Sequence, residues 1–294
     1  MEGDLMSDER AVEQAAERLI ADFSGEAAFI ARNLATGAVI GYRPDAVMPT
    51  ASTIKLLVLA ELYRQAEAGA VRLDDPLSIH PDDRRGGSGI LKDLSPALVA
   101  TVRDHAILMT ALSDNSSTAV LVRLLGLDRI LQSAREWGMA QTTATFGSGD
   151  IRSYATSTPR DIVQLLALIA QDAIVLPAAC AAMRDVLVTQ QYHDQIGRYL
   201  PFNPYARSGY DHPGPVIVRS KSGFSGPSGV RVDAGIVELP NDVRYVLCLM
   251  TEGSTDHLYR PEHDGATLNG RISRLIFDAW WPPDVPMPTK ECSE

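Results

Sequence analysis

Cysteine is scarce in this chain of 294 residues, which has only Cys180, Cys248 and Cys292. An odd number of cysteines without a C-x-x-C spacing argues against a disulfide framework and against the usual zinc motifs. Cys180 and Cys248 lie in apolar runs. We therefore expect buried free thiols, in keeping with a reducing compartment.

Patterns that hold metals or phosphates are missing as well. The six histidines form no H-x-x-x-H pair. His257, His263 and Asp264 lie close together in a polar loop, but nothing fixes their geometry, so a solvated loop is the better interpretation. The glycine run at 86–89 has no strand before it and no phosphate-binding lysine after it. We expect no metal and no cofactor.

Positive charge is in deficit, because 27 Lys and Arg face 37 Asp and Glu and leave a net charge of −10. This balance argues against a nucleic-acid or anionic-membrane partner. No apolar run approaches the length of a transmembrane helix. Residues 1–19 carry many acids and lack a basic segment followed by an apolar one, so they predict no secretory signal. We expect a cytoplasmic protein.

Apolar residues make up 45% of the chain and charged residues 22%, which is ordinary for a globular protein with one large core or two lobes. Helical spacing predicts helices over 7–23, 52–68, 101–112, 116–125, 128–137, 159–170, 177–188 and 266–281. Runs rich in β-branched residues predict strands over 27–32, 38–42, 216–221, 230–239 and 244–251. Residues 74–96 and 141–157 are expected to be irregular.

This order of elements predicts an α/β (α+β) fold. Two strands near the start and three near the end suggest one five-stranded antiparallel sheet built from both ends of the chain. We expect a single domain, with a sheet lobe at 1–45 and 210–281 and an inserted all-helical lobe at 46–209. The proline-rich residues 282–294 are expected to form a loose tail.

A possible nucleophile lies in the run from Pro49 to Ala60, where a turn leads directly into an apolar helix. Ser52 falls at the first turn, and Lys55 three residues later stands over the same helical face. A buried ammonium loses hydration, so a neutral amine that can take a proton from the serine becomes accessible. Taken alone, the pattern is much more typical of an ordinary capped helix.

Two further motifs follow in order along the chain, and together with the first they favour a nucleophilic serine over an ordinary helix cap. The three are Ser52-x-x-Lys55, Ser113-Asp114-Asn115 and Lys221-Ser222-Gly223. In this order they resemble the signature of class A β-lactamases and penicillin-binding serine hydrolases. The approach at 42–49, the helix start at 101–104, the loop exit at 156–159 and the strand at 230–237 are also similar to that family, so the resemblance covers about residues 25 to 280.

The resemblance implies a role for each residue of the catalytic set. Ser52 would attack a carbonyl, with Lys55 or a water as base, and Ser113, polarised by Lys221, would relay a proton to the leaving nitrogen. The backbone N–H groups of Ser52 and Phe224 would form an oxyanion hole, whose donors contribute about 3 kcal/mol each.

The remaining roles concern substrate binding. Asn115 would bind a substrate amide, and Gly223 would let substrate lie along the strand edge. Ser222 and Arg231 would hold a substrate carboxylate, although an arginine at an outward strand position is equally typical of a solvated surface. Asp114 is expected to be structural. The implied partner is a small molecule that carries a carboxylate.

The chain departs from the family in the loop that normally carries a glutamate for deacylation. Residues 141–157 contain no glutamate, and their only carboxylate is Asp150 in a Gly-Ser-Gly-Asp turn. Asp150 could replace the missing base, but such a sequence is more typical of a plain turn. We therefore expect weak deacylation.

Three functions remain open from the sequence. The first is a serine hydrolase of amide or ester bonds that opens β-lactams slowly. The second is a D-alanyl-D-alanine carboxypeptidase or esterase. The third is a β-lactam-binding sensor or trap that stays acylated, which the lost glutamate favours and the absence of a DNA-binding or transmembrane segment disfavours.

Overall fold

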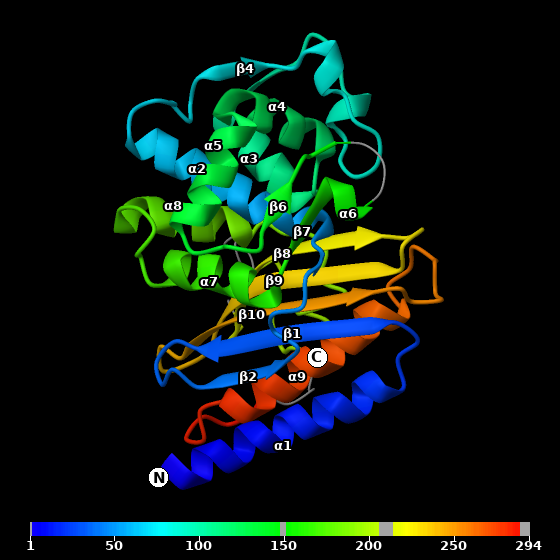
Figure 1. Cartoon of the computed structure of the whole chain (residues 1–294). Helices are drawn as coiled ribbons and strands as arrows, with labels where there is room; N and C mark the ends of the chain where they lie inside the picture. Colours follow the sequence, from blue (N-terminus) through cyan, green and yellow to red (C-terminus); the bar gives the residue numbers. More distant parts are fainter. Residues whose placement is uncertain (1, 148–150, 206–213, 289–294) are drawn as a thin grey trace, which may run out of the picture.

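A five-stranded antiparallel sheet lies at the centre of the computed structural model, which describes residues 2–147, 151–205 and 214–288 (Figure 1). In the order β2-β1-β10-β9-β8, its strands are β2 (Val39–Tyr42), β1 (Glu26–Asn33), β10 (Arg244–Glu252), β9 (Val230–Glu238) and β8 (Ile217–Ser225). Both ends of the chain thus contribute strands, which confirms the predicted fold, and β8 is an edge strand.

Strand β8 is longer than predicted, because it continues past Lys221 to Ser225. Ser222 and Gly223 have low strand propensity, but their backbones pair with Asp233 and Val232 of β9. Pairing with the neighbouring strand thus overrides local preference. The third motif consequently lies within the edge strand and not beyond its end.

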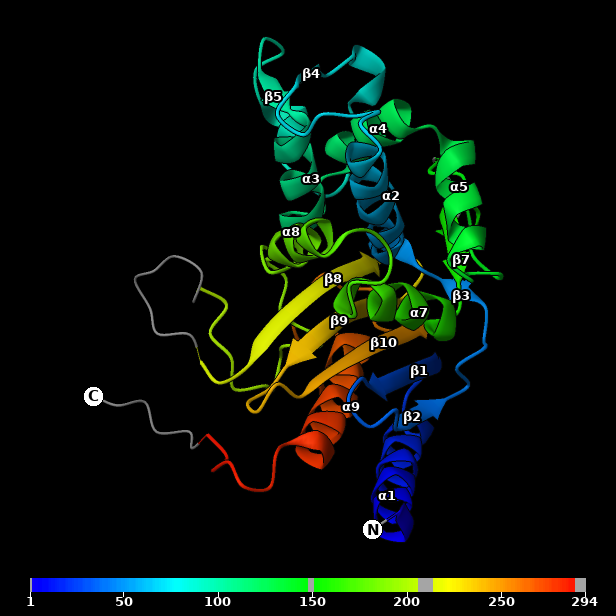
Figure 2. The ribbon, with the colours of Figure 1, turned by 90° about the vertical axis from the view of Figure 1, so that its left-hand side faces the viewer.

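Helices cover both faces of the sheet, as the perpendicular view shows (Figure 2). Helices α1 (Glu2–Ala21) and α9 (Asp264–Trp280) pack on one face around a core that includes Phe29, Leu247 and Phe277. Helices α7 (Pro159–Ala170) and α8 (Pro177–Leu187) pack on the other. Because helices cover both faces, β9 and β10 are buried along almost their whole length, and the middle of β10 is continuously apolar.

The helical lobe is built from short elements between β2 and β8. They are η1 (Ala51–Ile54), α2 (Lys55–Glu67), α3 (Val102–Ala111), α4 (Asn115–Leu125), α5 (Leu127–Glu136) and α6 (Ile151–Tyr154). The capping box at Thr101 is present, since its hydroxyl accepts from the N–H of Asp104 and the Asp104 carboxylate accepts in return. At α7 the Thr158 hydroxyl accepts the N–H of Asp161 without a reciprocal bond, and Pro159 is at the first helical position.

The two segments predicted to be irregular hold short strands. Strands β3 (Met48–Pro49), β7 (Ala155–Ser157) and β6 (Thr143–Ala144) form a small sheet, and β4 (Pro76–Ser78) pairs with β5 (Val99–Thr101). Single turns of 3-10 helix occur at Pro81–Asp83 and Leu91–Asp93. The prediction of irregular structure was wrong at these places. Strands of only two or three residues are too short to show an alternation of apolar and polar residues in the sequence.

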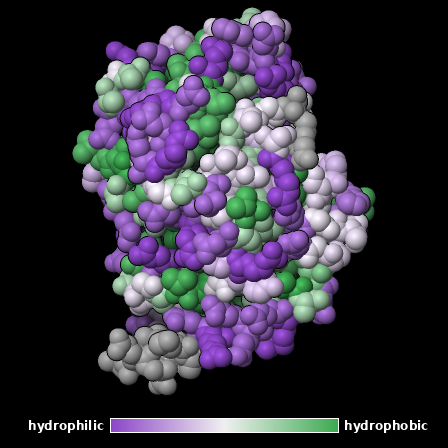
Figure 3. Space-filling view, in the orientation of Figure 1, coloured by the Kyte–Doolittle hydropathy of each residue, from purple (hydrophilic) through white to green (hydrophobic). Residues whose placement is uncertain are grey.

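The described structure also bears on the cysteines, on membrane-spanning helices and on the polarity of the surface. Cys180 and Cys248 are buried free thiols, as predicted, whereas Cys292 lies outside the described residues. Within the described ranges, no helix is both long and apolar enough to cross a bilayer. Polar residues cover most of the face seen in Figure 3, and apolar residues occur there in small separate groups. We keep the two-lobe division of the chain as a proposal.

Candidate active site

Ser52 lies in the single 3-10 turn η1, just before α2 begins at Lys55. The preceding Ala51 has a φ of 44°, a left-handed conformation that an alanine adopts only when its surroundings hold it there. Ser52 is half-buried, and within the described part of the chain its hydroxyl makes no hydrogen bond. The turn thus presents a serine oxygen that is free to react.

Lys55 is buried, with 1% of its surface exposed, and its ammonium faces the second motif. Its Nζ lies 2.7 Å from the carbonyl oxygen of Ser113, 2.7 Å from Oδ1 of Asn115 and 3.2 Å from Oγ of Ser113. Burial lowers the pKa of Lys55 well below its ordinary value, and the nearby charge of Lys221 lowers it further. A neutral amine, and therefore a base, is accessible at this position.

Lys221 enters the site from β8 and is also buried, with 1% of its surface exposed. Burial lowers its pKa to about 7, against the opposing attraction of Asp233. Its Nζ donates to the carbonyl oxygen of Ser222 at 2.6 Å. The expected pairing of Lys221 with the Ser113 hydroxyl is not found among the described contacts, and Lys55 occupies that position instead.

Asp114 has the structural role predicted for it. Its Oδ1 accepts the N–H of Ser117 at 2.8 Å and caps α4, and its Oδ2 accepts the N–H of Leu91 at 2.8 Å. Ser113, just before it, has a φ of 53°. The cap and the link to Leu91 hold this strained residue so that its carbonyl and hydroxyl oxygens both reach Lys55.

The glycine run at 86–89 borders the site, which the sequence did not indicate. Nδ2 of Asn115 donates to the carbonyl oxygen of Gly86 at 2.9 Å, and the N–H of Asn115 donates to that of Ser88 at 3.1 Å. A Cβ at Gly89 would overlap the side chain of Asp114. Asn115 is therefore held from both sides, by Lys55 and by Gly86, and one N–H bond of its amide remains for a substrate.

The third motif closes against the nucleophile. A Cβ on Gly223 would lie 2.6 Å from the backbone nitrogen of Ser52 and 3.0 Å from the carbonyl oxygen of Thr50. Only glycine lets the edge strand approach η1 so closely. The strand that carries Phe224 thus runs directly beside the Ser52 N–H.

Arg231 is not a solvated strand residue, since only 3% of its surface is exposed. Its guanidinium donates to the carbonyl oxygens of Val230 and Leu258, and it lies 5.9 Å from the ring centre of Phe224 and 5.8 Å from that of Tyr259. Among the described residues, no carboxylate lies within ion-pair distance of it. Asp194 and Asp256 act on it only from beyond that distance, so this buried cation favours an anionic ligand in direct contact.

Ser222 has a related property. Its Oγ is buried and has no hydrogen-bond partner in the described structure. Ser222 pairs with Asp233, and Phe224 pairs with Arg231, so Ser222 and Arg231 are diagonal neighbours on one face of the sheet. An unsatisfied hydroxyl beside an uncompensated guanidinium suits a carboxylate.

Comparison with known proteins places the chain in a family. A model of the beta-lactamase enzyme family matches residues 11–280. This chain belongs to that family. The beta-lactamase of Sphaerobacter thermophilus DSM 20745 has a similar structure, with a TM-score of 0.80 and 26% identity over 94% of this chain and 99% of that one. PBP-A is equally similar, with a TM-score of 0.80 and 26% identity over 92% and 96% of the two chains.

Two further relatives differ in what they are described to do. A point mutant of PBP-A, described as an acyl-enzyme complex with penicillin G, has 25% identity and a TM-score of 0.79 over 92% of this chain and 96% of that one. The beta-lactamase regulatory protein BlaB of Streptomyces cacaoi is 35% identical over 118 residues. That match spans 39% of this chain and 37% of the relative.

In this member of the beta-lactamase family, residues 141–157 form the loop in which the sequence lacks a glutamate. Asp150, the candidate for the missing base, lies outside the described residues. The described residues of this loop, 141–147 and 151–157, contain no carboxylate. His263, considered above as a polar-loop residue, accepts the N–H of Gly265 at 3.0 Å and caps α9.

Proposed function

We propose that this chain is a serine hydrolase that forms an acyl-enzyme on Ser52 with a small amide substrate bearing a carboxylate, and that the acyl-enzyme breaks down slowly. The observation that supports this most is Lys55, a buried lysine of lowered pKa one helical turn from a serine whose hydroxyl is free. The substrates we expect are β-lactams and related linear amides.

The first step would be attack of the Ser52 oxygen on the substrate carbonyl while its proton passes to neutral Lys55. Neutral Lys55 needs only two N–H bonds, for the carbonyl oxygen of Ser113 and the Oδ1 of Asn115, so its lone pair is available. The tetrahedral oxyanion would be bound by the backbone N–H groups of Ser52 and Phe224.

Collapse of the intermediate would break the carbon–nitrogen bond of the amide. The leaving nitrogen needs a proton, and the Ser113 hydroxyl, 3.2 Å from Lys55 Nζ, can pass it on from the lysine. Meanwhile Arg231 and Ser222 would hold the carboxylate on the leaving-group side. The proton taken from Ser52 thus ends on the leaving nitrogen, and Lys55 becomes neutral again.

Slow deacylation is proposed because no glutamate is present in residues 141–157 to activate a water. A non-turnover sensor or trap is the second candidate, and the similarity to the regulatory protein BlaB favours it. A D-alanyl-D-alanine carboxypeptidase or esterase, which the sequence also left open, is the remaining candidate.

The test is an intact-mass time course with benzylpenicillin and with a chromogenic cephalosporin. We expect a stoichiometric adduct on the wild type that clears slowly, and no adduct on Ser52→Ala. Ser88→Ala, which removes a hydroxyl from the rim of the same site, should still be labelled. An adduct that survives Ser52→Ala in a folded protein would disprove the assignment, and an adduct that never clears would favour the trap.

A further inference from the structure

A cavity of about 450 Å³ opens beside Phe224 and Arg231, at the end of the site where the carboxylate is proposed to bind. Its lining includes a tyrosine or phenylalanine ring from each of three separate segments: Tyr192, Phe224 of β8, and Tyr259 in the loop between β10 and α9. The volume is in the usual range for a small-molecule pocket. A second cavity, of about 360 Å³ near Arg219, contains none of the proposed catalytic residues.

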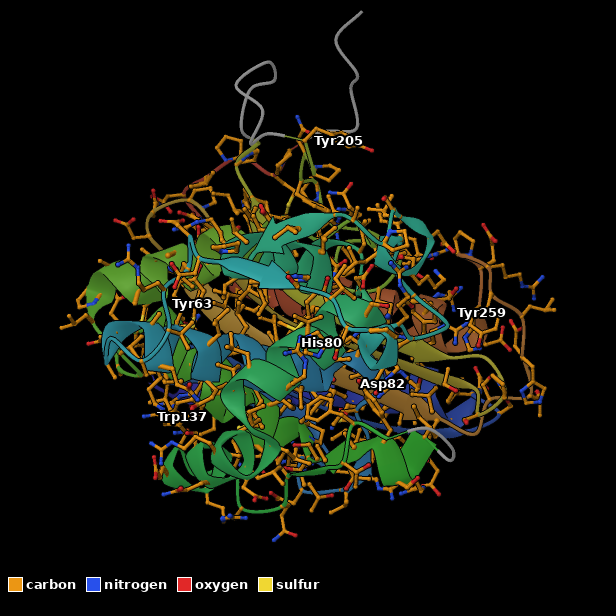
Figure 4. The ribbon with its side chains drawn as sticks, turned by 90° about the horizontal axis from the view of Figure 1, so that it is seen from above. Tyr63, His80, Asp82, Trp137, Tyr205 and Tyr259 are labelled. Carbon is orange, nitrogen blue, oxygen red and sulfur yellow. The ribbon has the colours of Figure 1, made fainter. Side chains whose placement is uncertain are left out.

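The three rings form one continuous wall. The ring centres of Tyr192 and Phe224 are 5.8 Å apart with an interplanar angle of 73°, and those of Phe224 and Tyr259 are 5.8 Å apart at 77°. Tyr259 lies at the margin of the molecule in Figure 4, and 66% of its surface is exposed. Edge-to-face rings with open surface suit a further aromatic ring, which would extend the same packing.

The position of Tyr259 is set by its neighbours. Its hydroxyl accepts the N–H of Gly226 at 2.9 Å, and a Cβ on Gly226 would overlap the ring. The ring therefore lies directly on the turn that follows β8. Arg231 lies over the same ring, 5.8 Å from its centre.

The charges around the cavity select against a second acidic group on the substrate. Arg260 lines the cavity, but its charge is already balanced by Asp256 at 3.1 Å. Asp194 also lines it, and burial raises the pKa of this carboxyl. Whether it is protonated or ionised, it offers a second anion no positive charge, and when ionised it repels one. Arg231 therefore remains for one carboxylate, and the rest of the cavity suits an uncharged aromatic group.

We propose that the substrate carries an aromatic substituent on the carbon that bears its carboxylate, so that the leaving group is an aromatic amino or hydroxy acid and not a small one. This inference rests on the proposed function, because it takes the carboxylate at Arg231 as its anchor. Tyr192, Phe224 and Tyr259 are then the residues that determine specificity for the leaving group.

The experiment uses three thioesters with the same benzoylglycyl acyl group. Their leaving thiols are mercaptoacetate, 2-mercaptopropionate and 2-mercapto-3-phenylpropionate, the last two tested as separate enantiomers. Release of thiol gives kcat/KM for each with the wild-type chain. We expect the phenyl compound of one enantiomeric series to exceed its methyl counterpart by about tenfold or more, the effect of one or two ring contacts.

Variants of the aromatic wall test whether it is the source of the preference for the phenyl compound over the methyl compound. Tyr259→Ala and Tyr192→Ala should each lower the phenyl-to-methyl ratio several-fold, whereas Tyr259→Phe, which keeps the ring, should preserve it. Tyr199→Ala, at a half-exposed tyrosine outside the cavity, serves as the control and should leave the ratio unchanged.

The outcomes separate the two proposals. Equal kcat/KM for the methyl and phenyl compounds would overturn the inference and leave the serine hydrolase intact. A phenyl preference that survives both alanine variants would also overturn it, because the wall would not be its source. No thiol release from any thioester, with Ser52→Ala equally silent, would contradict the proposed function and this inference with it.

Discussion

Lys55 and Lys221 are two buried lysines in one site, and besides burial the charge of Lys221 lowers the pKa of Lys55. Burial is the larger cause of the lowered pKa at both, and the charge of Lys221 adds to it at Lys55. A carboxylate opposes the shift in each case, Asp114 for Lys55 and Asp233 for Lys221. The arrangement favours a division of roles, in which Lys55 is the neutral base and Lys221 carries charge up to neutral pH.

The division predicts a pH dependence for acylation. Because the pKa of Lys221 is about 7, the lysine is protonated below pH 7 and loses its charge above it. If its cation helps to bind an anionic substrate, the second-order acylation rate constant should fall as the pH rises through 7. Stopped-flow or mass measurements with a chromogenic cephalosporin between pH 5 and 9 give the profile.

Lys221→Arg is the matched variant, since arginine stays charged throughout this range. Its acylation can be slower overall, but the fall above pH 7 should disappear. The same fall in the wild type and in Lys221→Arg would show that another group titrates, and the assignment to Lys221 would be wrong.

At the scale of elements, the site depends on the approach of an edge strand to a single helical turn. Strand β8 carries Lys221, Ser222 and Gly223 in succession, and η1 carries Ser52. A Cβ on Gly223 would lie 2.6 Å from the Ser52 nitrogen, so there is no room for a side chain between β8 and η1. The spacing of the oxyanion donors therefore depends on one glycine.

Gly223→Ala should cut the acylation rate by about a hundredfold or more, because a Cβ 2.6 Å from the Ser52 nitrogen must displace η1 or β8, and one misplaced oxyanion donor costs about 3 kcal/mol. Burst kinetics with the cephalosporin measure it. Gly25→Ala is the control, since its Cβ would overlap the carbonyl oxygen of Glu252 at another strand. Loss of stability in both variants with equal acylation rates would contradict the role of Gly223.

Elements and site differ in how far they could be predicted. The long helices, the five central strands and the order of the three motifs followed from periodicity, capping residues and a family resemblance, and the fold confirms the first two. The contacts of Asn115 with Gly86 and Ser88 did not follow, because an irregular loop has no period and its partner lies 29 residues away along the chain.

The aromatic wall could not be predicted for the same reason. Tyr192 and Tyr259 lie in connecting segments far apart in sequence, and they meet Phe224 only because β8 is at the edge of the sheet. The burial of Arg231 was also beyond the pattern, since alternation alone places such a residue outward, and α9 covers that face.

At the scale of the whole molecule, the sheet carries ionisable groups on both faces, and both cost stability. Lys221 lies on the face toward the helical lobe, and Asp233 lies on the opposite face, where Oδ2 accepts the N–H of Ile196 at 3.1 Å and Oδ1 has no partner among the described residues. Burial raises the pKa of Asp233 to about 7 and lowers that of Lys221 to about 7. Function at one edge thus leaves unfavourable charges inside the fold.

The pKa shifts of Asp233 and Lys221 have opposite signs, so they change the free energy of unfolding in different pH ranges. The raised pKa of Asp233 contributes stability at low pH that is lost as the pH rises from 3.8 to about 7, because the folded state holds a proton that the unfolded state releases. The lowered pKa of Lys221 has the reverse effect, and stability returns as the pH rises from about 7 to 10.5. Together these two groups make the chain least stable near pH 7.

Asp233→Asn tests this at the acid side. Between pH 5 and pH 8 the wild type should lose about 3 kcal/mol of its free energy of unfolding, because folding keeps Asp233 protonated up to about pH 7 while the unfolded chain releases the proton. The asparagine does not titrate, so the variant should gain that amount relative to wild type. Urea denaturation at the two pH values measures the difference. Asp45→Asn is the control, because Arg160 lowers the pKa of Asp45 from its ordinary 3.8, so Asp45 is ionised at both pH values and the difference between this variant and wild type should not change between them. A flat difference for Asp233→Asn would mean that Asp233 is ionised in the folded protein well below neutral pH.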